Sequence, residues 1–170
     1  MNKEFLDSVR SEVGNVLEVG CNIGMQLRIL DQMGFINLSG IDYQLHAVEK
    51  AKGLTKNMNI IQASAFDIPF KDGYFDLVYT SGVLIHIAPK DISVVLKEIH
   101  RCAKKYIWGF EFFAEQYTEV SYRGNQDMLW KTNFCKLYLD QFSDLELVKE
   151  KKYPYLQNEN VDVMFLLKKK

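Results

Sequence analysis

A carboxylate and two glycines follow the first apolar run of the chain, in the segment Leu17-Glu18-Val19-Gly20-Cys21-Asn22-Ile23-Gly24. Glycine lets a backbone approach a ligand closely, and ligands of parallel sheets bind beyond the carboxyl ends of the strands. A carboxylate at this place would repel a phosphate and would suit a cationic ligand. An ordinary strand-to-helix turn is the alternative. The residues expected to contact a cationic cofactor are Glu18, Gly20, Cys21, Asn22 and Gly24.

A second carboxylate, Asp42, ends the next apolar run, about twenty residues after the turn. It can accept hydrogen bonds from both hydroxyls of a ribose, and Tyr43 beside it joins the expected site. The alternative is a helix N-cap for residues 44–52, which is compatible with the same position. The glycine spacing differs from the Gly-x-Gly-x-x-Gly pattern that faces a pyrophosphate. Together these features favour a cofactor with an adenosine and cationic groups, such as S-adenosylmethionine, over a nicotinamide dinucleotide.

Two side chains could move a proton near such a cofactor. His86 follows the fourth apolar run, and a histidine that titrates near neutrality can remove a hydroxyl proton. Glu111 directly follows the fifth apolar run, so it too should lie at the mouth of the site. His86 and Glu111 are therefore the catalytic candidates. The alternatives are a packed histidine and a surface carboxylate.

The elements that must position these residues alternate between short apolar runs and amphipathic stretches, which predicts repeated strand–helix units and a parallel sheet. The expected strands are residues 15–19, 38–42, 59–62, 75–80 and 105–110. The expected helices are residues 25–33, 44–52 and 89–102. We expect Gly34 to end the first helix and Gly53 to end the second. The last two runs, residues 145–152 and 161–167, predict a hairpin.

The composition of the 170-residue chain is that of an ordinary globular protein, with 48% hydrophobic and 25% charged residues. A formal net charge of −1 gives no field to attract nucleic acid or an anionic membrane, so neither is an expected partner. The three cysteines, Cys21, Cys102 and Cys135, lack the spacing of a zinc site or a disulfide framework, so no metal is expected. No apolar run resembles a signal peptide or a membrane span. We expect a cytoplasmic protein, and the oligomeric state stays open.

From Leu17 almost to its C-terminus, the chain resembles the pseudaminic acid biosynthesis-associated methylases, a bacterial branch of the class I S-adenosylmethionine methyltransferases. The resemblance rests on Leu17–Gly24, Gly82–Ile87, Val120–Gly124, Leu129–Lys131 and Phe134. It implies an α/β fold with a Rossmann-like, doubly wound, mostly parallel seven-stranded sheet and an antiparallel C-terminal hairpin. Residues 1–170 would form a single methyltransferase domain, with an N-terminal helix at residues 1–14 and an acceptor-side insert at residues 112–141.

The resemblance also implies how the rest of the cofactor is held. Adenine would be contacted by Ser64 and Ala65, with Phe66 packed nearby, although Asp67 in the same stretch is equally suited to form a turn before Pro69. The methionine part would be contacted by Thr80, Ser81 and Gly82. The family pattern has a basic and an acidic residue before Phe134, where this chain has Thr132 and Asn133.

The acceptor implied by the family name is related to a glycan, such as an acidic sugar or a nucleotide sugar. The residues expected to bind it are Tyr122, Arg123 and Lys131. Residues 122–136 carry three cations against one anion, and a guanidinium can grip a carboxylate through two hydrogen bonds. The alternative is a solvated loop. The expected reaction is methyl transfer to an oxygen or a nitrogen; the rival functions are a non-catalytic module that binds S-adenosylmethionine and a nicotinamide-dependent oxidoreductase.

Overall fold

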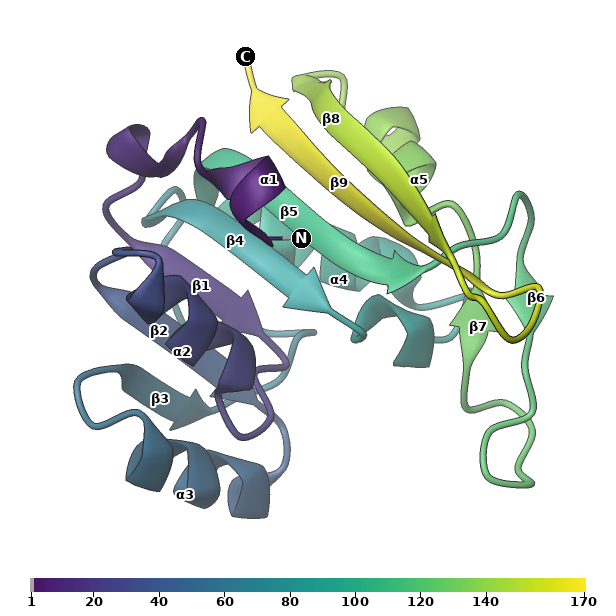
Figure 1. Ribbon diagram of the computed structural model, residues 1–170, viewed down its shortest axis with the longest axis horizontal. Helices are drawn as coiled ribbons and strands as arrows, with labels where there is room; N and C mark the ends of the chain where they lie inside the picture. Colours follow the sequence, from purple (N-terminus) through teal and green to yellow (C-terminus); the bar gives the residue numbers. More distant parts are fainter. Residues whose placement is uncertain (1) are drawn as a thin grey trace.

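The computed structural model describes residues 2–170, which are built around one seven-stranded sheet (Figure 1). The strand order is β3-β2-β1-β4-β5-β9-β8. The strands are β1 Val16–Val19, β2 Leu38–Asp42, β3 Asn59–Gln62, β4 Phe75–Ser81, β5 Ala103–Phe112, β8 Leu145–Pro154 and β9 Val161–Lys169. Strands β1 to β5 pair in parallel, whereas β9 is antiparallel to β5 and to β8. The expected Rossmann-like sheet with an antiparallel C-terminal hairpin is confirmed.

Helices cover both faces of this sheet. They are α1 Asn2–Leu6, α2 Met25–Gln32, α3 Leu45–Leu54, α4 Ile92–Cys102 and α5 Phe134–Gln141, with short 3-10 turns η1 Arg10–Glu12 and η2 Leu84–His86. Buried side chains of α1, α2 and α3 form one apolar layer with one face of the sheet, and those of α4 and α5 form the other. Strand β1 contributes to both layers because successive side chains point to opposite faces. Leu17 and Val19 pack toward α4, whereas Val16 packs toward α2.

The order of the strands creates a switch point between β1 and β4. The chain moves outward from β1 to β2 and β3, and then returns to the other side of β1 with β4. The connections that leave the carboxyl ends of β1 and β4 therefore diverge, and such a crevice is where open parallel sheets bind ligands. The turn at Gly20 and the loop after Ser81 both lie at this crevice.

A small separate hairpin stands beside the carboxyl ends of the strands (Figure 1). It consists of β6 Thr118–Glu119 and β7 Trp130–Lys131, paired antiparallel. Residues 112–141, expected as an acceptor-side insert, thus contain this hairpin and helix α5. Asn133 is the N-cap of α5, because its side-chain oxygen accepts the backbone N–H of Lys136 at 2.9 Å.

Several predicted boundaries differ from the structure. Helix α3 does not end at Gly53 but continues to Leu54, because Thr55 ends it with a hydroxyl that donates to the Ala51 carbonyl at 2.7 Å. Gly34, by contrast, takes the left-handed conformation expected of it, with φ of 84°. Helix α4 begins at Ile92, three residues later than expected. Met1 of the expected N-terminal helix lies outside the described residues, and residues 2–14 hold α1 and η1 in place of one helix.

Strand β5 is longer than the sequence pattern predicts. It was expected over residues 105–110 and extends over Ala103–Phe112. At the carboxyl end the extension arises because β9 pairs with β5 beyond Phe110, where Glu111 lies opposite Val163. At the amino end Ala103 lies opposite Phe75 of β4. None of the helices described in residues 2–170 combines the length and apolar character needed to cross a membrane.

Candidate functional site

The turn after β1 is held in a left-handed conformation against β2. Gly20 has φ of 75°, and its N–H donates to the Ile41 carbonyl at 2.8 Å. Asn22, with φ of 47°, also lies in the left-handed region, which asparagine tolerates better than most residues. The side chain of Cys21 points into the core, where burial raises the pKa of its thiol to about 12. This turn therefore presents mainly backbone to the crevice.

Gly24 has a packing role in addition to its place in the turn. It precedes α2 with φ of 79°, and a Cβ there would lie 2.8 Å from the Thr55 methyl group. The start of α2 is thereby packed against the end of α3.

Asp42 joins the ends of β1 and β2 through its carboxylate. One oxygen accepts the N–H of Asn22 at 2.8 Å, and the other accepts the N–H of Gln44 at 2.9 Å. The N-cap of α3 is Gln44 and not Asp42, so the expected N-cap role of Asp42 is wrong, and its second bond forms a turn just before the helix. A carboxylate offers about four acceptor positions, which leaves capacity for two ribose hydroxyls. The ribose interpretation of Asp42 is compatible with this geometry.

Glu18 lies beneath the turn, not in the crevice. Its side chain is only 3% exposed and accepts the hydroxyl hydrogen of Tyr79 at 3.0 Å. Burial raises the pKa of Glu18 to about 8, while the Tyr79 hydroxyl and the Leu27 amide act in the opposite direction. Any effect of Glu18 on a cationic cofactor must act through the turn above it.

The expected adenine side combines exposed aromatic rings with a compact turn. Tyr43 is 78% exposed and Phe66 is 44% exposed. The Ser64 hydroxyl accepts the N–H of Phe66 at 3.1 Å, and the Ser64 carbonyl accepts the N–H of Asp67. Ser64 therefore shapes the turn around Ala65, and the expected turn at Asp67 is present.

Arg101 of α4 anchors the connection from β3 to β4, a role that the sequence did not reveal. Its guanidinium donates to the carbonyls of Ile68 and Phe70, at 2.8 and 2.7 Å, and pairs with Glu98 and Asp72. The hydrogen bonds from Arg101 lower the pKa of Glu98. A single helix side chain thus fixes the backbone that follows the expected adenine site.

The loop after β4 contacts the turn after β1 directly. Thr80 is buried, Ser81 is half-buried, and Gly82 is exposed with φ of 66°. The N–H of Gly82 donates to the Phe110 carbonyl at 2.9 Å. A Cβ at Gly20 would lie 2.4 Å from a methyl carbon of Val83, so this valine packs against the bare backbone of the turn.

His86 is exposed at the end of η2 and meets the small hairpin. Its Nδ1 lies 3.0 Å from the Met128 carbonyl oxygen, and its ring contacts the Tyr122 ring edge-on at 5.4 Å between centroids. A carbonyl oxygen can only accept, so Nδ1 carries the hydrogen of this bond. In the neutral ring, Nε2 then holds the lone pair that a general base needs.

Glu111 does not open onto the mouth of the site as expected. It is 1% exposed, and its Oε1 accepts the N–H of Val83 at 3.2 Å. The reason for the error is that β5 continues through Phe112, which keeps Glu111 inside the sheet and turned toward the loop after β4.

The expected acceptor residues lie on the β6–β7 hairpin and differ in whether their side chains already have hydrogen-bond partners. Tyr122 and Asn125 exchange two backbone hydrogen bonds of 3.0 Å, which defines a two-residue turn at Arg123 and Gly124. Arg123 is exposed, with φ of 52° and its guanidinium 5.2 Å from the Tyr122 ring centroid. Lys131 instead donates to the Asn160 side chain at 3.0 Å.

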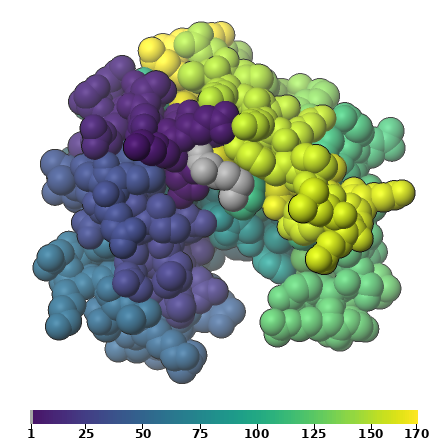
Figure 2. Space-filling view, in the orientation of Figure 1, coloured from purple at the N-terminus to yellow at the C-terminus, as the bar shows by residue number. Residues whose placement is uncertain are grey.

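A hollow separates the two sides of the candidate site. Figure 2 shows it between the blue atoms of the α3 region and the green atoms of the β6–β7 hairpin. Strands β1, β4 and β5 point toward this side of the molecule in Figure 1. The hollow therefore lies where the sheet topology predicts a ligand site.

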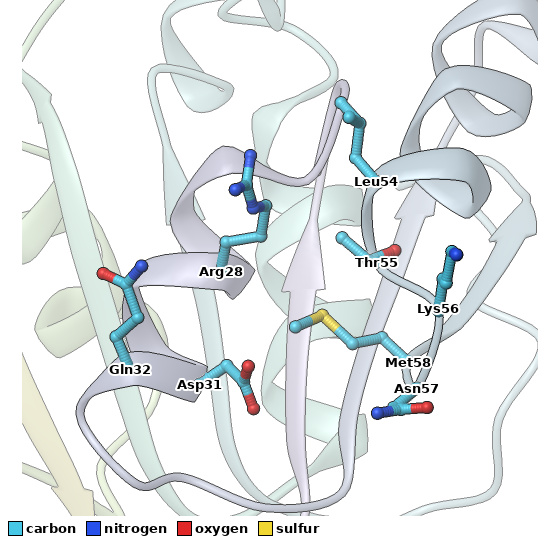
Figure 3. Close-up of a pocket in the computed structure, with 8 residues that line it drawn as sticks. All are labelled: Arg28, Asp31, Gln32, Leu54, Thr55, Lys56, Asn57 and Met58. Carbon is cyan, nitrogen blue, oxygen red and sulfur yellow. The ribbon is translucent and has the colours of Figure 1, made fainter.

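Two further pockets lie at the opposite, amino-terminal edge of the sheet. One, of about 190 Å³, lies between α2 and residues 54–58 (Figure 3). The other, of about 560 Å³, lies near the starts of β1, β2, β3 and β4. None of the expected site residues lines either pocket. Within residues 2–170, no three His, Cys, Asp or Glu side chains are grouped to hold a metal ion.

Comparison with known proteins gives a family match over the first half of the fold. Residues 17–106 match the family described as a methyltransferase domain. The chain is 33% identical over 89 residues to an uncharacterized methyltransferase of Synechocystis, covering 52% of this chain and 42% of the relative. It is 30% identical over 95 residues to a sterol 24-C-methyltransferase of Pneumocystis carinii, covering 52% and 25%. It thus spans less than half the length of these curated relatives.

The overall fold has counterparts among solved structures. A SAM-dependent methyltransferase from Methanosarcina mazei superposes with a TM-score of 0.76 and 17% sequence identity, covering 91% of this chain and 92% of that one. The family match covers more than half of the chain and includes the Gly20 turn, Asp42 and the loop after β4. The chain therefore belongs to the methyltransferase domain family of class I enzymes, and S-adenosylmethionine is the cofactor that this membership implies.

Proposed function

We propose that this protein transfers a methyl group from S-adenosylmethionine to a small, anionic, sugar-related acceptor. The observation that carries the proposal is the meeting of three groups at the switch point: the Gly20 turn, Asp42 and the loop that ends in His86. The first two are joined by the 2.8 Å bond from Asn22 to Asp42, and the third packs on Gly20 through Val83.

The residues at the crevice suit S-adenosylmethionine. The Gly20 turn presents bare backbone to the methionine part, and Glu18 lies buried below it, out of contact with the crevice. Asp42 retains acceptor positions for the ribose, and the exposed rings of Tyr43 and Phe66 offer planar surfaces to adenine. When bound, the cofactor supplies an activated methyl group, and the protein aligns the acceptor and excludes water.

His86 is our proposed general base. Its Nδ1–H is committed to the Met128 carbonyl, so the exposed ring keeps Nε2 available to take a proton from an acceptor hydroxyl or ammonium group. The hairpin that supplies this carbonyl also carries Arg123. Acceptor binding and proton removal would thus be organised by the same segment.

Arg123 is our proposed contact for an acidic group on the acceptor. The other cations of residues 122–136 are already engaged, Lys131 by Asn160 and Lys136 by Asp140. Arg123 is exposed and stands over Tyr122, an arrangement that can hold both a carboxylate and the apolar face of a sugar ring. The resemblance of Val120–Gly124 to the pseudaminic acid biosynthesis-associated methylases supports an acidic sugar or a nucleotide sugar.

A screen with methyl-labelled S-adenosylmethionine tests the proposal. Acidic sugars, nucleotide sugars and their neutral analogues are incubated with the protein, and label transfer is measured by mass spectrometry. We expect label on an acidic sugar compound and little on its neutral analogue. Transfer only to neutral analogues would refute the proposed acceptor class, and cofactor binding without transfer to any compound would favour a non-catalytic binding module.

A further inference from the structure

A buried carboxyl group lies beneath the loop that follows β4. Glu111 points from β5 into the apolar layer between the sheet and α4, where its Oε1 accepts the N–H of Val83 at 3.2 Å. Its Oε2 is buried and has no hydrogen-bond partner within residues 2–170. The Tyr138 hydroxyl of α5, whose pKa is raised by burial and by the charge of Glu111, is also buried without a partner there.

Val83 connects this carboxyl group to both sides of the candidate site. Its N–H is bound by Glu111, and its carbonyl accepts the N–H of His86 at 3.0 Å. Its side chain occupies the space that a Cβ of Gly20 would need. One residue therefore contacts the turn on the cofactor side and the histidine on the acceptor side.

Resting on the proposed function, we infer that Glu111 is a positioning residue that acts through Val83 to hold the Gly20 turn and His86 in register. Glu111 is too deeply buried to touch a ligand in the crevice. Its carboxyl group instead gives the Val83 amide a partner that no apolar side chain could supply. Without it, Val83 would lose the bond that holds its backbone while its side chain packs on Gly20.

The energetic cost of this arrangement argues against a purely stabilising role. Burial raises the pKa of Glu111 to about 7, although the Thr80 hydroxyl and the amides of Val83, Leu84 and Ile85 act in the opposite direction. Burying a carboxyl group costs free energy unless it is hydrogen-bonded, and the hydrogen bond that the structure gives Glu111 comes from the Val83 amide. The backbone of this loop is therefore what the carboxyl group orients.

Two variants of Glu111 and one control separate these roles. Glu111→Leu removes the acceptor for the Val83 amide, whereas Glu111→Gln keeps a carbonyl oxygen that can accept it. Tyr138→Phe is the matched control, because it removes a buried, unpartnered hydroxyl from the same apolar layer. The readouts are hydrogen exchange of peptides covering residues 19–24 and 80–87, and the affinity for S-adenosylhomocysteine by calorimetric titration.

We expect Glu111→Leu to exchange faster than wild type in both peptides, with little change in the other strands. Its affinity for S-adenosylhomocysteine should fall at least about tenfold, the size expected when one hydrogen bond to a charged group is lost. Glu111→Gln should lie between Glu111→Leu and wild type in both readouts, and Tyr138→Phe should resemble wild type.

Unchanged exchange of either peptide in folded Glu111→Leu overturns the inference, whatever its cofactor affinity. If Glu111→Leu does not fold, the same comparison is made with Glu111→Gln, and wild-type exchange together with wild-type affinity in that variant overturns it. If wild type itself does not bind S-adenosylhomocysteine, the proposed function fails, but the exchange of the two peptides still decides the role of Glu111.

Discussion

The carboxylate of Asp42 accepts the backbone N–H of Asn22 at 2.8 Å, which ties the end of β2 to the turn after β1. The same carboxylate accepts the N–H of Gln44, the residue that precedes α3. One side chain therefore shapes both the turn after β1 and the turn before α3. Its substitution should affect the cofactor site more than the sheet.

Asp42→Ala should weaken binding of S-adenosylhomocysteine at least about tenfold, because charge-assisted hydrogen bonds contribute roughly 1.5 to 3 kcal/mol each. Asp42→Asn should lose less of this affinity, since its amide oxygen can still accept one backbone N–H. Calorimetric titration measures both affinities. An affinity of Asp42→Ala equal to that of wild type would leave Asp42 with only its structural bonds.

His86→Gln should reduce kcat about 10² to 10⁴-fold, the usual range for loss of a general base, while leaving the affinity for S-adenosylhomocysteine nearly unchanged. His46→Gln is the matched control, because it makes the same substitution at an exposed histidine of α3. Steady-state kinetics on the acceptor found by the screen provide the measurement. An equal loss in both variants, or a loss of cofactor affinity in His86→Gln, would contradict the assignment.

Arg123→Lys should reduce turnover of the acidic acceptor substantially, since an ammonium group cannot reproduce the two parallel hydrogen bonds of a guanidinium. Arg123→Asn should be worse, and it suits the left-handed backbone of this position, where φ is 52°. Cofactor affinity should not change in either variant. Equal activity of Arg123→Lys on acidic and neutral acceptors would show that the arginine is structural.

Glu18→Gln should reduce the loss of stability that wild type shows as pH rises. The pKa of Glu18 is raised from 4.5 to about 8 in the folded protein, so between these values the unfolded chain gives up a proton that the folded chain keeps. The contribution of Glu18 to the stability of the folded protein is therefore fully present below pH 4.5, and it is lost as the pH rises to 8. Glu111, with a pKa of about 7, acts in the same direction.

Urea unfolding at several pH values between these limits measures the effect. Between the lowest and the highest of these pH values, the free energy of unfolding should fall by at least about 1 kcal/mol more for wild type than for Glu18→Gln. Glu146→Gln, at an exposed position of β8, should follow wild type. If the free energy of unfolding changes with pH by the same amount in wild type and Glu18→Gln, then Glu18 ionises at a similar pH in the folded and unfolded states.

Much of the fold follows from local patterns in the sequence. The apolar runs that form β1, β2 and β4 are buried parallel strands, and such strands are recognisable because both of their faces contact the core. Gly34 ends its helix region as predicted, but Gly53 does not, because the Thr55 hydroxyl provides the stop and no left-handed residue is needed. Helix α5 was missed although Asn133 is a good N-cap.

The parts of the site that sequence reasoning missed depend on contacts between distant residues. The sequence predicts Glu111 at the mouth because it directly follows the fifth apolar run, whose carboxyl end should face the site. Only the pairing of β5 with β9 and the amide of Val83 explain its burial. The hold of Arg101 on the carbonyls of Ile68 and Phe70 likewise joins residues more than thirty positions apart. The site residues of β1 and β2 were easier to predict because they directly follow strong strands.

The cofactor assignment is tested most directly by thermal unfolding with S-adenosylhomocysteine and, separately, with NADH. At about a hundredfold over its dissociation constant, S-adenosylhomocysteine should add about 2.7 kcal/mol of stability. For a chain of this size, that corresponds to a rise in Tm of roughly 5 to 10 °C, and NADH should give none. A rise in Tm with NADH but not with S-adenosylhomocysteine would contradict the cofactor site described above.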